Sequence, residues 1–146
     1  MTRARNAGAR ICIFMHSDAV AGPGSCQGLL DRARECSRDG LKWGVLFTSY
    51  DALAALNVAL LDDVGLWDTN LAWYFSDNDY YRRVRLAGYE CLETNLPVEH
   101  RPSQTIKSDP ELRFLNGITF PLYESYYRSK WGGKPGQECF RRPFNR

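Results

Sequence analysis

The sequence predicts an α/β domain. Short apolar runs, such as residues 11–15 and 43–47, alternate with segments whose apolar residues recur at helical spacing, and turn-forming residues separate them. Of the 146 residues, 44% are hydrophobic and 25% are charged, values that are typical of globular proteins and exclude a disordered chain. A chain of this length can bury one hydrophobic core. We therefore expect a single domain over residues 1–146, with an irregular basic tail at 134–146.

The first half of the chain contains two predicted strands around one helix. Residues 11–18 form an apolar strand that ends in polar residues, and the Gly- and Pro-rich turn at 21–25 follows. Residues 26–38 place leucine, alanine and cysteine at helical spacing, and residues 42–50 form the second strand. Residues 51–65 are ambiguous: their Ala and Leu content favours one helix, whereas Asn57 equally suits a break between an extended piece and a short helix.

A helix is predicted from Asp77 to about Ala87, after an aromatic loop at residues 66–75. Ser76 is in position to act as the N-cap, Asp79 occupies the capping-box position three residues later, and Gly88 supplies a left-handed residue at the end. We expect Trp73 and Tyr74 of the preceding loop to be core residues.

The last third of the chain predicts two strands and two helices. Residues 89–93 and 97–100 are short strands. One helix starts at Asp109-Pro110 and stops at Asn116-Gly117, and another runs from Pro121 to Lys130 and ends at Gly132.

Composition excludes several classes of function. The net charge is only +2, with +3 on residues 1–10, +5 on residues 126–146 and −6 between them. Basic ends around an acidic middle suit a central metal or phosphate site, but solvated termini are the favoured interpretation, and we expect no nucleic-acid partner. The apolar run at 11–15 is too short for a membrane span, so we expect a soluble, cytoplasmic protein.

Cysteine and histidine counts argue against a structural zinc site. The five cysteines are odd in number and show no Cys-x-x-Cys spacing, and the chain has only two histidines. We expect reduced thiols, several of them in the core.

Three polar residues at the ends of predicted elements are candidate site residues. Asp18 ends the most apolar strand, where ligands bind in open α/β sheets, and its carboxylate suits Mg²⁺ or Mn²⁺. His100 ends another strand, and Asp77 opens a helix. Taken singly, each is more typical of a structural role: Asp18 as a turn residue, His100 as a hydrogen-bonded histidine and Asp77 as a helix-stabilising acid.

The order of these motifs resembles the second half of a family 2 glycosyltransferase with a GT-A-type, Rossmann-like fold. The resemblance covers about residues 6–133 and rests on five segments, which are "FMHSDAVAGPG", "VGLWDTN", "FSDNDYYRRVRLAGYE", "LPVEH" and "YYRSKWGG". It implies a partial GT-A-type sheet flanked by helices and truncated at the N-terminus. The segment from Asp77 to Gly88, with "GLWD" before it, is the most specific part.

The resemblance implies roles for residues on the donor side. Asp18 matches the metal-binding aspartate of an Asp-x-Asp motif, and His16 stands where the first aspartate is usual, so that His16 and Ser17 face the donor. His100 matches a histidine that completes the metal or diphosphate site in some relatives. Asp77 matches the general base, which takes the proton of the acceptor hydroxyl.

On the acceptor side, the resemblance assigns Gly65, Trp67 and Asp68 to the acceptor-facing loop, and Asp79 and Arg83 to supporting positions on the helix. The implied reaction transfers a sugar from a UDP- or GDP-linked donor to a carbohydrate or glycolipid acceptor. Mn²⁺ or Mg²⁺ would neutralise the departing diphosphate.

The family's nucleotide-binding half precedes the Asp-x-Asp strand, and here only ten residues do so. We therefore expect the first strand to lose its neighbours on one side, which leaves an exposed edge or an apolar face. Either the chain is a truncated product, or a partner chain supplies the missing half, or the domain has kept the remnant of the fold for another purpose. The alternative is a non-catalytic binding or assembly module that pairs with a partner through this edge.

Overall fold

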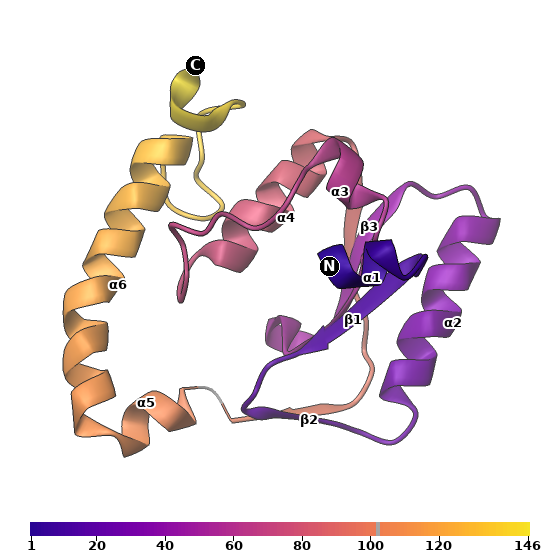
Figure 1. Cartoon of the computed structure of the whole chain (residues 1–146), viewed down its shortest axis with the longest axis horizontal. Coiled ribbons are helices and arrows are strands. Elements are labelled where there is room, and N and C mark those ends of the chain that lie inside the picture. The colour runs from indigo at the N-terminus through magenta and orange to yellow at the C-terminus, as the bar shows by residue number, and fades with distance from the viewer. Residues whose placement is uncertain (102) are drawn as a thin grey trace. The chain divides into compact units, whose positions relative to one another are not determined.

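The computed structural model describes residues 1–101 and 103–146, which form two compact units (Figure 1). Unit 1 comprises Met1–Leu66 and Arg83–Pro102, and unit 2 comprises Trp67–Arg82 and Ser103–Arg146. Helix α4 (Ser76–Leu86) contributes its beginning to unit 2 and its end to unit 1.

Unit 1 contains two sheets. The four-stranded sheet has the spatial order β1 (Ile11–Met15), β4 (Leu53–Asn57), β3 (Trp43–Phe47) and β5 (Glu90–Glu93). Only the β3–β5 pair is parallel, so the sheet is mixed. Strands β2 (Ala19–Ala21) and β6 (Val98–His100) form an antiparallel pair. The predicted α/β class and the edge position of the first strand are confirmed.

Helix α2 (Ser25–Arg38) packs on the four-stranded sheet and forms the core of unit 1 (Figure 1). Its buried residues Leu29, Ala33 and Cys36 recur at spacings of four and three, so that they share one face. They contact buried residues of β3 and β4. The helical spacing of the apolar residues in the sequence therefore predicted this helix correctly.

The ambiguous segment 51–65 is split, because Asn57 ends the strand. The Asn57 amide donates to the Trp43 carbonyl at 3.1 Å, and its side-chain oxygen accepts from the backbone N–H of Ala59, also at 3.1 Å. The short helix α3 (Leu60–Asp63) follows. An asparagine that bonds to nearby backbone competes with helix formation, and here it decides between the two interpretations.

Unit 2 is mainly helical. It contains the start of α4, α5 (Gln104–Ser108), α6 (Pro110–Trp131) and a final 3₁₀ turn, η2 (Pro143–Asn145). Its core gathers three buried residues, Leu71, Tyr127 and Trp131. The sequence did not predict α5, nor the short helix α1 (Thr2–Asn6) of unit 1.

The predicted break between two helices at residues 116–121 is wrong, because α6 continues through Asn116, Gly117 and Pro121. The start was correctly predicted: the Asp109 carboxylate accepts from the N–H groups of Glu111 and Leu112, at 2.8 and 3.2 Å. Gly117 and Pro121 weaken a helix locally, but packing of an aromatic face outweighs that cost. The helix ends at Gly132, whose φ of +74° is the predicted left-handed conformation.

Two details of the α4 region also differ from prediction. The helix begins at Ser76 itself, so Ser76 is its first residue and does not precede the helix as predicted, whereas Gly88 has the predicted positive φ of +78°. Trp73 is 49% exposed and is not a core residue. Tyr74 is half-buried, and its ring lies 4.9 Å from that of Phe120, in an edge-to-face contact.

Candidate metal centre

The pairing of β2 with β6 brings His100 beside Asp18. Ala19 lies opposite His100 in this pair, and the backbone N–H of Arg101 donates to the Asp18 carbonyl at 3.0 Å. His16 follows the last residue of β1, and its N–H donates to the Ala52 carbonyl at 2.9 Å. The two-stranded sheet therefore joins residues that are more than eighty positions apart in the chain.

His16, Asp18 and His100 form a compact cluster, which we call the triad. The His100 Nε2 atom lies 3.3 Å from Asp18 Oδ1, and one potential ligand atom from each residue lies within 4.8 Å of the others. The two imidazole rings are 5.3 Å apart at a steep angle of 70°. All three side chains are partly buried, so that an ion held between them would have access to solvent and to a substrate.

Residues around the triad add a further carboxylate and an unusual backbone. Asp51 Oδ1 lies 4.0 Å from His16 Nε2, and the ring of Tyr50 lies 6.3 Å from that of His100. Tyr50 and Asp51 both have positive φ values, +56° and +45°, which are costly for residues other than glycine. Among the described residues, the buried Nδ1 of His100 has no hydrogen-bond partner.

The donor set fits a divalent cation. Two imidazoles and one carboxylate suit transition metals such as Fe²⁺ and Zn²⁺ and can also hold Mn²⁺, whereas Mg²⁺ prefers oxygen ligands only. The separation of 3.3 Å between His100 and Asp18 is close to the ~3 Å expected for two adjacent ligands of one ion with bonds of about 2.1–2.2 Å. The triad therefore fits Mn²⁺ better than Mg²⁺. Ser17, the other predicted donor-side residue, lies between two of its members and is exposed.

Asp77 lies in unit 2, in the first turn of α4. It is half-buried, and within the described chain its carboxylate has no ion pair or hydrogen bond. Phe75, two residues earlier, has a φ of +62°, so the chain turns sharply into the helix. An unpaired carboxylate at the start of a helix is available to accept a proton.

Asp68 and Asp79, by contrast, belong to a closed network around Lys130. The Lys130 Nζ lies 2.6 Å from Asp68 Oδ2 and 2.6 Å from Asp79 Oδ1. Asp79 is fully buried and also accepts from the Trp131 indole N–H at 2.8 Å. The Tyr126 hydroxyl donates to Asp68 at 2.9 Å. We call these residues the lysine network.

The network changes the proton affinities of its members. Burial opposes ionisation of Asp68, but hydrogen bonds from Lys130, Asn70 and Tyr126 outweigh it and lower the Asp68 pKa to about 2. Burial, followed by the hydrogen bond to Asp68, raises the pKa of Tyr126. Asp68, predicted to face an acceptor, therefore already has three protein partners.

The remaining predicted site residues are divided between the two units. Trp67 stacks on Tyr80 in unit 2, with centroids 4.5 Å apart and an angle of 7°, so that one face of its indole is covered. In unit 1, Gly65 has a φ of +77°, and the Arg83 guanidinium donates to the Val64 carbonyl at 2.7 Å. Arg83 therefore supports the chain next to the predicted acceptor loop.

Sequence reasoning missed Lys130, Tyr126 and Asp51. Tyr126 and Lys130 are four residues apart and thus on one face of α6, a spacing that indicates neighbours but not a buried charge. Asp51 follows a strand in the manner of a simple turn residue. None of the three carries a local signal for its contacts.

Comparison of the chain with models of protein families, with curated proteins and with solved structures gave no match. No helix among the described residues is both long enough and apolar enough to cross a membrane. All five cysteines are free, and burial raises the pKa of the Cys91 thiol to about 11.

Proposed function

We propose that the chain is a glycosyltransferase-like domain of GT-A type, which binds a nucleotide-sugar through a divalent cation and transfers the sugar to an acceptor hydroxyl. The observation that carries the proposal is the triad at the end of β1. Its members come from "FMHSD" and "LPVEH", two of the segments on which the resemblance rests, and they lie within ligand distance of one another. The mixed sheet flanked by helices is compatible with the α/β class to which this fold belongs.

The residues divide the chemistry between them. Asp18, His16 and His100 would hold the ion, which supplies charge neutralisation for the diphosphate leaving group. Asp77 accepts the proton of the acceptor hydroxyl, a role that requires an ionised carboxylate without a competing cation. Asp68 and Asp79, with Lys130 between them, shape the acceptor loop and the start of α4 instead of reacting.

Calorimetric titration of the chain with UDP and GDP, with and without Mn²⁺, tests the donor site. We expect binding that requires Mn²⁺, that Asp18→Asn abolishes and that Asp77→Asn preserves, because only Asp18 belongs to the triad. Asp39→Asn is the matched control, since Asp39 is an exposed carboxylate at the end of α2. Nucleotide binding that is indifferent to both metal and Asp18 would refute the assignment.

The second candidate function is an assembly module, and the edge position of β1 favours it. Among the described strands of the four-stranded sheet, β1 pairs with β4 and lies at the edge, which is where a partner strand could add to the sheet. Light scattering on the purified chain distinguishes the two candidates. A stable dimer or heteromer whose formation ignores Mn²⁺ and nucleotide supports the module; a monomer that binds nucleotide supports the transferase.

A further inference from the structure

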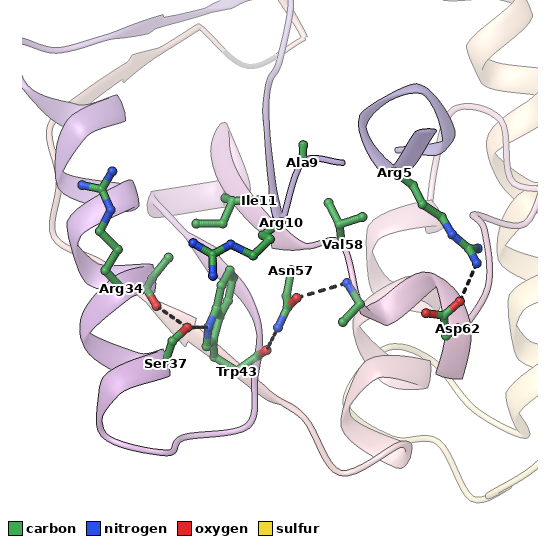
Figure 2. Close-up of a pocket in the computed structure, with 12 residues that line it drawn as sticks. Arg5, Ala9, Arg10, Ile11, Arg34, Ser37, Trp43, Asn57, Val58 and Asp62 are labelled. Carbon is green, nitrogen blue, oxygen red and sulfur yellow. Dashed lines mark hydrogen bonds and ion pairs between the residues drawn. The ribbon is translucent and has the colours of Figure 1, made fainter. Parts of the chain in front are cut away.

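A cavity of about 640 Å³ lies on unit 1, at the end of β1 opposite the triad (Figure 2). Its apolar lining includes Ile11 at the start of β1, Val58 after β4 and the buried Ala33 of α2. The five residues of β1 separate it from the triad by about 15 Å, at ~3.3 Å per residue. A ligand here would therefore not touch the proposed metal ion.

Three arginines and one aspartate supply the charged part of the lining. Arg5 pairs with Asp62 at 2.8 Å, and Arg34 pairs with Asp31 at 2.8 Å. Across the described residues, the Arg10 guanidinium has neither an ion pair nor a hydrogen bond. Figure 2 shows the Arg10 side chain running from the segment before β1 towards α2, into the lining of the cavity.

The polar atoms behind the arginines satisfy one another. The indole N–H of Trp43 donates to Ser37 Oγ at 3.0 Å, and that hydroxyl donates to the Ala33 carbonyl at 2.8 Å. Asn57 bridges the Trp43 carbonyl and the N–H of Ala59. Trp43 is only 3% exposed, so this part of the wall is held by packing as well as hydrogen bonds. The wall is preformed, and of its three arginines Arg10 alone has no partner among the described residues.

We propose that this cavity binds a small organic phosphate monoester, with its apolar body on the aliphatic lining and its phosphate on Arg10 and Arg34. An arginine has five N–H donors in a planar fork that matches phosphate oxygens, and Arg34 uses only part of that capacity on Asp31. Arg10 supplies a positive charge without a carboxylate partner among the described residues, and Arg34 has N–H donors left beyond its pair with Asp31. A cation would be repelled, and a neutral apolar ligand would cover the Arg10 guanidinium without pairing it. The volume is within the ~300–1,000 Å³ range of small-molecule sites.

Amide and indole NMR spectra of the whole chain, recorded with a metal chelator present, test the proposal separately from the nucleotide site. The probes are adenosine monophosphate and phenyl phosphate. The control compounds are adenosine, which lacks the phosphate, and inorganic phosphate, which lacks the organic body. We expect both esters to shift the Trp43 indole signal and to bind at least about tenfold more tightly than adenosine or phosphate, since each of those loses one set of contacts. Equal binding of the two esters identifies the phosphate and an apolar body as sufficient; tighter binding of adenosine monophosphate identifies a nucleotide.

The variants Arg10→Gln and Arg34→Gln test whether these two arginines bind the phosphate. We expect each to weaken ester binding about tenfold, because each removes a charged donor pair. Arg38→Gln is the matched control, because Arg38 is an exposed arginine of the same helix that does not line the cavity. Absence of binding by either ester, equal losses in all three variants, or inorganic phosphate binding as tightly as the esters would overturn the proposal. Failure here leaves the metal-dependent nucleotide test unaffected, since that test depends on Asp18.

Discussion

The triad of unit 1 and the lysine network of unit 2 use similar side chains in opposite ways. In the triad, the side chains of Asp18 and His100 are 21% and 13% exposed, and the His100 imidazole lies 3.3 Å from the carboxylate. In the lysine network, Asp79 is fully buried and Lys130 lies within 2.6 Å of two carboxylates. The first has capacity left for a ligand, whereas in the second one lysine is shared by two carboxylates that also accept hydrogen bonds from Tyr126 and Trp131.

The difference shows why an aspartate cannot be assigned a role from its motif alone. Asp77 and Asp79 are two positions apart on the same helix, but only Asp79 reaches the cation of α6. Buried charges are stable only when paired, so Asp79 serves the fold. Asp77 remains without a partner within the described chain and is the carboxylate available for chemistry.

The largest effect should follow from removing the cation of the lysine network. Lys130→Met leaves the buried Asp79 and the partly buried Asp68 without their shared cation, and we expect a loss of about 3–5 kcal/mol in the free energy of unfolding. Urea unfolding of the variant measures it. Lys134→Met is the control, because the Lys134–Glu124 pair is more exposed and should contribute at most about 1 kcal/mol. Equal effects of the two substitutions would remove the distinction between a closed network and a surface pair.

Mn²⁺ should stabilise the folded chain through the triad and not through the lysine network. Mn²⁺ in about hundredfold excess over its dissociation constant should stabilise the chain by about 2.7 kcal/mol through mass action. Thermal unfolding with and without Mn²⁺ measures the shift, which Asp18→Asn should abolish and Tyr126→Phe should preserve. A shift that persists without the Asp18 carboxylate would place the ion elsewhere.

Acid should weaken the lysine network through Asp68. Its folded-state pKa of about 2 lies below the ordinary value of about 3.9, so the stability contributed by its ionised form is present above pH ~4 and is lost as the pH falls towards 2. We expect a loss of the order of 1–2 kcal/mol, after allowance for solvent screening. Unfolding of the wild type and of Asp68→Asn at several pH values should show their difference shrinking over this interval. A constant difference would contradict a depressed pKa.

The smallest effect concerns the outer hydrogen bond of the network. Tyr126→Phe removes the hydroxyl that donates to Asp68 but keeps the aromatic ring, and we expect a loss of about 0.5–1.5 kcal/mol. It should also reduce the depression of the Asp68 pKa, which carboxyl NMR titration measures directly. An unchanged pKa would indicate that Lys130 and Asn70 are sufficient to hold the carboxylate ionised.

Several elements could be predicted because their signals lie within a few residues. The spacing of Leu29, Ala33 and Cys36 predicted α2, and the apolar run at 11–15 predicted β1. Asp109-Pro110 and Gly132 marked the two ends of α6. Inside that helix, local breakers were misleading, because Gly117 and Pro121 cost little compared with the packing of Tyr127 and Trp131.

The sequence by itself therefore determined α2, β1, the two ends of α6 and the positions of the candidate carboxylates. Only the tertiary structure decided which side chain each of those carboxylates contacts. His100 meets Asp18 because β2 and β6 pair, and Lys130 meets Asp68 and Asp79 because these side chains are buried together. Hydrophobic periodicity acts over a single turn or strand, whereas the pairing of buried charges depends on contacts between segments that the chain brings together only on folding.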